Sequence, residues 1–371
     1  MSGRRRSLLA AALTAVMATG MTLAPQAALA GRSGAEVAFL VPNGIDPRWQ
    51  ADAITFVRTL DAHAPGTSWI VLNAHDHETT QIEQAKEAIT GGTRVLVVSP
   101  VNPDAAGQIV AYARPRGVTV IAYDRPIEAR HLPLFVGYDP VAVGRLQGQY
   151  LLSHVVSGWL VIVNGPATDD LARSQYDGLE ATLSRSRGSF SYRPALWTPA
   201  WSASAGRGAT RQGVFELGPE KRPAAIVTQS DVLASGAIEE LRTLSGVRAV
   251  LTGAGSSLLG LRAVLAGNQT MTVFEPGETE AEAAAGAAAS ILAGSRLPKR
   301  FSQRYEIQAG TSVRSALFRP VLVTAKTLQA KLVRTGLLSS DANQWPMNVE
   351  GLCAGMTKIC HIFRVRAVHS R

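Results

Sequence analysis

Short apolar runs separated by helical patterns place the strongest constraint on the fold of this chain. Runs rich in β-branched residues occur at Glu36–Val41, Ser68–Leu72, Arg94–Ser99 and Val118–Ala122. Runs without polar alternation are typical of parallel strands that are buried on both faces. Helical patterns lie between these runs, so the alternation predicts βαβ units around a parallel sheet.

Three helices are predicted to begin in the same way. Asp46-Pro47, Asn102-Pro103 and Asp139-Pro140 each place a capping side chain before a proline. A proline suits the first helical position because the amide hydrogen that it lacks would have no partner there. These pairs therefore mark helix starts that follow the predicted strands.

A second series of strands and helices follows the first. Further strands are predicted at Trp159–Val163, Ala224–Thr228, Arg248–Thr252 and Met271–Glu275, and helices at Ala172–Leu183, Ala234–Leu244 and Glu278–Ala293. The length beyond the first thirty residues exceeds what one hydrophobic core supports, so two Rossmann-like lobes are expected. Neither lobe has a glycine-rich phosphate loop between a strand and a helix, which argues against a nucleotide-dependent enzyme.

Residues 1–30 read as a signal peptide rather than as part of the fold. Arg4, Arg5 and Arg6 precede the apolar stretch Leu8–Leu23, and Ala28-Leu29-Ala30 forms a small-residue cleavage site. The arginines fit either a general or a twin-arginine export signal. No cysteine follows the cleavage site to accept a lipid, so we expect a periplasmic or secreted protein.

Charge and cysteine content exclude several other classes. The formal net charge is +9, and removal of the signal peptide with its three arginines would lower it to +6. The sequence has no stripe of basic residues interleaved with aromatic residues, so it gives no sign of nucleic-acid binding. The spacing of Cys and His residues suggests no metal site, and no cofactor is expected. Cys353 and Cys360 could either close a local disulfide or remain free in the tail 341–371, which ends in a basic run.

The run Val118–Pro126 carries the first indication of function. Its apolar residues end abruptly in Tyr123, Asp124 and Arg125. Ligands of open α/β sheets bind outside the carboxyl ends of the strands. An acceptor beside a fork of donors can grip a hydroxyl-rich ligand, since each hydroxyl both donates and accepts. The alternative is a local ion pair at the end of a strand.

With these pieces in order, the chain resembles the periplasmic sugar-binding proteins of bacterial ABC importers, and within them the xylose-binding group. The resemblance runs from about residue 36 to residue 335. It is carried by Pro47–Gln50, Val98–Val101, Tyr123–Pro126, Gly144–Gly148, Gly165–Asp169, Trp197–Trp201, Ser230-Asp231, Gly236–Ile238 and Thr270–Val273.

The resemblance implies a type I periplasmic binding protein: two α/β lobes, joined by a three-strand hinge, that close over a sugar. It divides the chain into a signal peptide (1–30), a first lobe (34–138 with 274–306), a second lobe (139–273 with 307–340) and a tail (341–371). It also implies a monomer that is not an enzyme and that delivers a monosaccharide, xylose or a related sugar, to a membrane permease. A sugar-responsive transcriptional regulator would need a DNA-binding motif where this chain has its signal peptide.

The same resemblance assigns roles in the site. Trp49 and Trp201 match aromatic positions that stack on sugar rings, and the polar contacts fall on Arg48, Asp124, Arg125, Asp170 and Arg173.

Four segments depart from the xylose-binding pattern. Asp170-Leu171 and Ser230 stand where asparagines are expected, Gly255 lies in a segment that has lost its carboxylate, and Glu275 replaces a lysine. Ser230 and Glu275 are still expected to face the ligand. Because a site that pairs hydroxyls discriminates strongly against unpaired groups, these changes should alter ligand choice. They leave open a second interpretation, a degenerate or sensory protein with altered or lost sugar binding.

Overall fold

The structure of the protein is a computed structural model that describes residues 34–328, apart from 45–46, 187–189, 193–194, 245, 256–257 and 309. The predicted signal peptide, the tail and both cysteines lie outside these residues. No helix in the described part of the chain is long and apolar enough to cross a membrane.

The first of two sheets has seven strands in the order β12-β13-β5-β4-β3-β1-β2. Their bounds are β1 (Val37–Val41), β2 (Trp69–Asn73), β3 (Val95–Val98), β4 (Thr119–Tyr123), β5 (Leu134–Tyr138), β12 (Gln303–Ile307) and β13 (Thr311–Phe318). All strand pairs are parallel except β12 with β13. Every residue of β1 and β3 is buried, as their unbroken apolar runs predicted.

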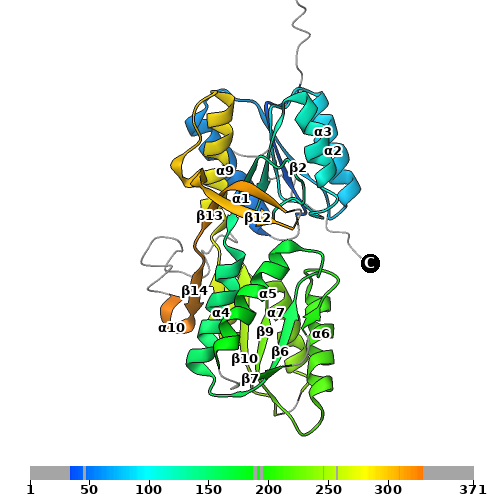
Figure 1. The fold of residues 1–371 in the computed structure, drawn as a ribbon, viewed down its shortest axis with the longest axis vertical. Helices are drawn as coiled ribbons and strands as arrows, with labels where there is room; N and C mark the ends of the chain where they lie inside the picture. The colour runs from blue at the N-terminus through cyan, green and yellow to red at the C-terminus, as the bar shows by residue number, and fades with distance from the viewer. Residues whose placement is uncertain are drawn as a thin grey trace, which may run out of the picture. The chain divides into compact units, whose positions relative to one another are not determined.

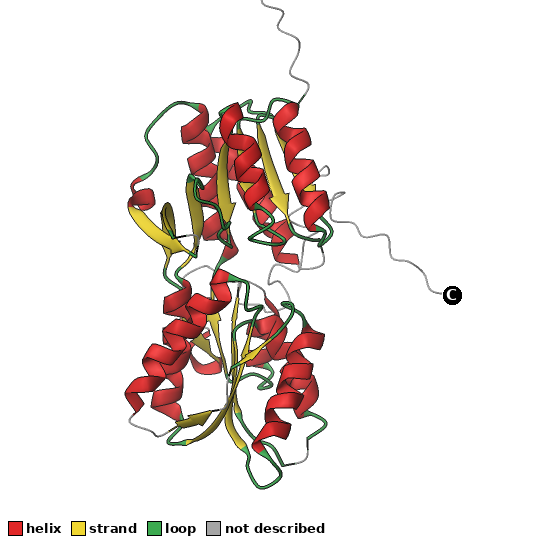
Figure 2. Cartoon of the chain, turned by 45° about the vertical axis from the view of Figure 1, so that its right-hand side comes forward, coloured by secondary structure: helices red, strands yellow, loops and turns green. Residues whose placement is uncertain are grey.

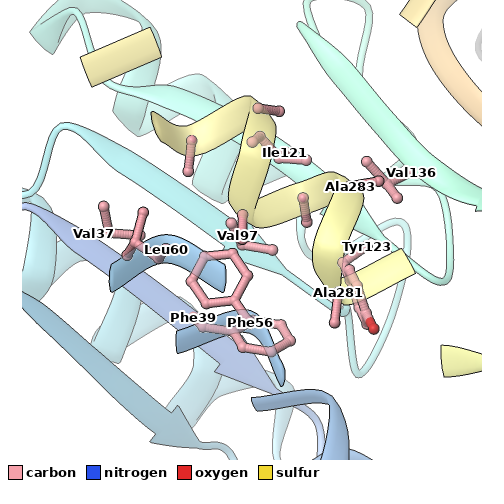
Figure 3. Packing of buried hydrophobic residues seen from close by; sticks show 14 of the residues in the cluster. Val37, Phe39, Phe56, Leu60, Val97, Ile121, Tyr123, Val136, Ala281 and Ala283 are labelled. Atoms are coloured by element: carbon pink, nitrogen blue, oxygen red, sulfur yellow. The ribbon is translucent and has the colours of Figure 1, made fainter. Parts of the chain in front are cut away.

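Helices cover both faces of the first sheet. α1 (Pro47–His63) and α9 (Gly277–Leu292) pack on one face, and α2 (Glu78–Thr90) and α3 (Gly107–Ala113) on the other (Figure 1). The rings of Phe39, Phe56 and Tyr123 fill the core beneath α9, whose buried alanines let the helix approach closely (Figure 3).

The second sheet has the strand order β14-β11-β10-β9-β6-β7, with β8 also paired to β6. Its strands are β6 (Gly158–Asn164), β7 (Phe190–Tyr192), β8 (Leu196–Trp197), β9 (Pro223–Thr228), β10 (Val250–Gly255), β11 (Met271–Phe274) and β14 (Val321–Thr324). Only β14 pairs antiparallel among them, with β11. Two mostly parallel sheets therefore confirm the α/β fold class.

Helices also flank the second sheet (Figure 2). α4 (Pro140–His154) and α5 (Asp170–Leu183) pack together on one face, and α6 (Ala203–Leu217) and α7 (Asp231–Leu241) on the other. α8 (Leu258–Leu265) and the short α10 (Ala325–Leu328) pack beside β11 and β14.

The chain passes between the sheets after β5, after β11 and after β13. We expected residues 307–340 to belong to the second lobe, and for β13 this is wrong. β13 pairs with β5 and β12 of the first sheet, so the last passage falls between Phe318 and Val321. Hydrogen bonds join the three passages: Asp139 N donates to Phe318 O at 3.1 Å, and the Tyr138 hydroxyl donates to Pro276 O at 3.0 Å.

The three predicted helix starts have different outcomes. α1 begins at Pro47 as expected, although Asp46 is outside the described residues. Asp139 caps α4 by accepting from Ala142 N at 3.1 Å. The prediction at Asn102-Pro103 is wrong: α3 begins only at Gly107, and the Asn102 side chain closes a turn on Asp104 N at 3.0 Å instead.

Packing of α4 against α5 gives a stability prediction. A Cβ at Gly144 would lie 1.8 Å from Gln175 O, so a side chain there must push the helices apart. We expect Gly144→Ala to lower the free energy of unfolding by about 1–3 kcal/mol. Gly208→Ala on α6 is the control, because a Cβ there meets open space and removes backbone entropy from the unfolded chain. Denaturant titration measures the free energy of unfolding of both variants. Equal values for Gly144→Ala and Gly208→Ala would contradict the close packing of α4 on α5.

Candidate functional site

Arg48 lies at the centre of a group of four charged side chains in the first lobe. It lies in the first turn of α1 and pairs with Asp124 Oδ1 at 2.6 Å, Glu280 Oε2 at 3.1 Å and Asp52 Oδ2 at 3.2 Å. We call Arg48, Asp52, Asp124 and Glu280 the Arg48 cluster. Its carboxylates come from α1, from the end of β4 and from α9, so one guanidinium ties three separate elements together.

The inner side of the cluster is fully enclosed. The Tyr123 hydroxyl donates to Asp52 Oδ2 at 2.9 Å and lies against Gly277 O at 3.1 Å. Burial raises the pKa of Asp52 to about 6, although Arg48 and the Tyr123 hydrogen bond oppose this rise. Tyr123 thus forms the floor of the cluster, and the residues after it reach the surface.

Asp124 is held in a restricted backbone conformation at the outer side of the cluster. Its φ is +65°, a left-handed value that Asp tolerates better than most residues. Its amide donates to Val136 O at 2.9 Å, and its side chain remains 15% exposed. Arg125 Nε lies 3.7 Å from Asp124 Oδ2. The strand end therefore places an acceptor beside a donor fork, an arrangement that fits both a ligand grip and a local ion pair, so the grip stays a prediction.

Trp49 has a different setting from the one expected of a stacking residue. It is only 4% exposed and belongs to the first-lobe core. The Arg48 guanidinium carbon lies 4.3 Å from the centre of its ring. The ring therefore supports Arg48 in this structure, and its stacking on a ligand stays a prediction.

In the second lobe, Trp201 is fixed by a carboxylate that sequence reasoning missed. Trp201 Nε1 donates to Asp169 Oδ2 at 2.8 Å, and Asp169 also caps α5 by accepting from Leu171 N at 3.0 Å. The Trp201 ring covers Gly165, where a Cβ would lie 2.2 Å from Cζ2. The segment Gly165–Asp169 carried part of the resemblance. The sequence did not show whether Asp169 or the adjacent Asp170 binds the Trp201 indole.

The two lobes bring Asp169 and Arg125 into electrostatic contact. Burial raises the pKa of the Asp169 carboxyl, and Arg125 opposes that rise while Asp124 adds to it. Arg125 thus interacts with an acid from each lobe. The structure therefore brings Arg48, Asp124, Arg125 and Trp201 into one region.

Asp170 and Arg173 belong to a separate group. The Tyr305 hydroxyl of β12 donates to Asp170 Oδ2 at 2.6 Å, and Ser174 Oγ lies 3.2 Å from the same hydroxyl. Arg173 Nε donates to the carbonyl of Ala167. Asp170 thus links α5 to the first sheet, and among the described residues neither Asp170 nor Arg173 forms a hydrogen bond or ion pair with the Arg48 cluster.

Ser230 acts as a helix cap. Its hydroxyl accepts from Leu233 N at 3.1 Å at the start of α7. The adjacent Asp231 is buried, and accepts from Thr272 Oγ1 and Gln269 Nε2, each at 2.8 Å. A ligand contact from Ser230 stays a prediction.

Glu275 is the most unusual carboxyl of this region. It follows β11 and is 8% exposed, and its amide donates to Gly255 O at 3.1 Å. Burial raises its pKa from the usual 4.5 to about 8, and the negative charge of Asp124 adds to this rise. Unlike the carboxylates of the Arg48 cluster, it makes no ion pair within the described part of the chain.

The described residues contain no group of three or more His, Cys, Asp or Glu side chains arranged to hold a metal ion. The acidic side chains instead surround Arg48 and Arg125. Charged side chains of this kind can bind a ligand through charge-assisted hydrogen bonds. These bonds are stronger than hydrogen bonds between neutral groups. A tryptophan beside them adds an apolar surface.

Two α/β lobes with charged side chains and a tryptophan at their facing ends define the class of two-lobed ligand-binding proteins. Comparison with known families agrees. Residues 37–296 match the periplasmic binding protein domain family, and the chain belongs to this family.

Relatives with curated names cover most of the chain. The D-xylose-binding periplasmic protein of Escherichia coli (strain K12) is 29% identical over 233 residues, which are 62% of this chain and 69% of that protein. The protein of the same name from Haemophilus influenzae is 25% identical over 300 residues, 80% of this chain and 88% of that protein.

Solved structures share the fold over the same length. An ABC transporter solute-binding protein from Clostridium phytofermentans with bound β-D-glucose has a TM-score of 0.74 and 23% identity, covering 82% of this chain and 99% of that one. A carbohydrate transporter solute-binding protein from Chloroflexus aurantiacus, in complex with D-glucose, has a TM-score of 0.74 and 22% identity, covering 83% and 98%.

The buried carboxyls predict how stability depends on pH. The folded protein keeps a proton on Glu275 up to about pH 8, whereas the unfolded chain loses it near 4.5. Between these values the folded state binds more protons, so the free energy of unfolding falls as pH rises. Asp52, with a pKa of about 6, acts in the same direction.

We therefore expect the unliganded protein to melt at a lower temperature at about pH 8 than at about pH 5. The Glu275→Gln variant removes one of the two protons and should show a flatter profile by calorimetry. Glu282→Gln, at an exposed position of α9, is the control. A profile equally steep in E275Q and wild type would contradict the assignment of this proton.

Proposed function

We propose that the protein is an extracytoplasmic solute-binding protein that captures a monosaccharide between its lobes and delivers it to an ABC permease. Family membership and relatives named for D-xylose support this role. Xylose or a related sugar is the proposed ligand class. The protein would act as an exported monomer and not as an enzyme.

The observation that carries this proposal is the position of Asp124 and Arg125. The Arg48 cluster fixes Asp124, and Arg125 lies between Asp124 and Asp169 of the other lobe. A sugar hydroxyl can donate to Asp124 while accepting from Arg125. Trp201, oriented by Asp169, offers an apolar face for the sugar ring.

A second candidate function is a sensory or degenerate relative with altered or lost sugar binding. Two observations favour it. Trp49 is buried in the core, and Ser230 is engaged as a helix cap. A protein of this kind would present its lobes to a partner with little dependence on sugar.

A thermal-shift screen distinguishes these candidates. A ligand that binds only the folded state raises the melting temperature by mass action. We expect at least one pentose, hexose or sugar derivative to raise it at millimolar concentration. If no sugar in the screen does so, the transport proposal is wrong and the degenerate relative is favoured.

Asp124→Asn tests the proposed grip directly. Asparagine tolerates the same left-handed backbone, so the substitution removes charge with little strain. A charge-assisted hydrogen bond contributes about 1.5–3 kcal/mol, so we expect the dissociation constant of the sugar found in the screen to rise by roughly tenfold or more. Isothermal titration calorimetry measures this change.

Asp76→Asn is the matched control, because Asp76 also has a left-handed backbone (φ 61°) and lies in a loop bonded to Asn43. It should leave sugar affinity unchanged. Unchanged affinity in D124N as well would contradict the role of the strand end.

A further inference from the structure

The segment 275–277, which begins with Glu275, is bonded to two tyrosines of the first lobe. Tyr138 donates to Pro276 O at 3.0 Å, and Tyr123 lies 3.1 Å from Gly277 O. Gly277 packs so closely on Asp52 that a Cβ would lie 2.2 Å from Oδ1. This fixes Glu275 at the passage from β11 to α9, beside the Arg48 cluster.

The Glu275 carboxyl interacts electrostatically with acids of both lobes. Its electrostatic neighbours are Asp124 and Arg48 from the first lobe and Asp231 from the second. Glu280, one turn into α9, also interacts with it. The only cation among these neighbours, Arg48, already pairs with three carboxylates.

Glu275 therefore stands out as a buried acid with no hydrogen-bond partner in the described structure. It is more than nine-tenths buried, while every carboxylate of the Arg48 cluster is paired. Burying a charge is unfavourable unless it is paired. An acid in this setting either keeps its proton or receives a cation from outside the chain.

The charges around Glu275 favour the second possibility. Its charged neighbours are acids and one arginine that already pairs with three carboxylates. This position therefore suits a ligand that carries the positive charge itself.

We propose that the ligand is an amino sugar, a monosaccharide whose protonated amine pairs with the Glu275 carboxylate while its hydroxyls contact Asp124 and Arg125. This inference rests on the proposed function, because it assumes that a sugar occupies the region between the lobes. It adds the chemical class of the sugar.

Proton balance gives the inference a distinctive signature. At neutral pH the free Glu275 carboxyl holds a proton, because its pKa is about 8. An ammonium group that pairs with the carboxylate displaces this proton to the buffer, so binding releases up to one proton. A neutral sugar leaves the proton in place. Affinity for the amino sugar should accordingly rise from about pH 6 to about pH 7.5, as Glu275 becomes easier to ionise.

The test is calorimetric titration of the purified protein with glucosamine, galactosamine and mannosamine, each against its neutral parent sugar and its N-acetyl derivative. Titrations in two buffers of different ionisation enthalpy count the protons released. We expect at least one amino sugar to bind about tenfold or more tightly than both neutral counterparts, with proton release.

Variants assign the effect to one side chain. Glu275→Gln should abolish proton release and most of the preference, and Glu275→Lys should reverse the preference toward neutral sugars. Glu282→Gln, at an exposed position of α9, should change neither. The wild-type preference needs no variant, so the test holds even if a substitution impairs folding.

The outcomes separate this inference from the proposed function. If a neutral sugar binds as tightly as every amino sugar, the amino-sugar inference is wrong while sugar binding stands. A preference retained in E275Q would also overturn it. If none of these sugars binds while a pentose in the thermal-shift screen does, the amino-sugar inference is wrong and sugar binding stands. If no sugar binds in either experiment, both proposals fail.

Discussion

The ion pairs of Arg48 are the interaction on which the rest of the proposed site depends. One guanidinium joins the start of α1, the end of β4 and the first turn of α9, elements that are far apart in the sequence. Removing a partner from a buried pair leaves an uncompensated charge, which is far more costly than the net value of the pair. Arg48 therefore fixes Asp124 in an uncommon backbone conformation, where its carboxylate and the adjacent Arg125 reach the second lobe.

The passages between the sheets place the remaining groups. Tyr138 and Asp139, at the first passage, bond to residues of the second and third. Glu275 lies at the second passage, so a ligand that pairs with it would contact the segment about which lobes of this kind move. Asp169 and Trp201 form a rigid unit on the other side, because one carboxylate both caps α5 and orients the indole. Ligand binding and lobe closure would thus act on the same few residues.

Sequence alone was sufficient for the parallel strands β1 to β4, β6 and β9 to β11, because buried parallel strands leave unbroken apolar runs such as Val95–Val98. It placed β13 in the wrong lobe, since pairing with β5 depends on a long-range contact that no local pattern shows. Asp124 and Arg125 were visible as polar residues at a strand end. The burial of Trp49 beneath Arg48, and the choice of Asp169 over Asp170 as the partner of Trp201, depend on how helices rotate when they pack. Glu275 was visible as a departure, but only the structure shows it buried and unpaired.

In the proposed site, the Arg48 cluster presents Asp124 to a ligand held between the lobes. A crystal structure of the protein with its bound sugar would show whether it does. We expect sugar hydroxyls within hydrogen-bonding distance of Asp124 and Arg125, and the Trp201 ring against the sugar. Arg48 should still pair with Asp52, Asp124 and Glu280. A sugar bound away from Asp124, or an Asp124 side chain turned away from Arg48 in the complex, would contradict it.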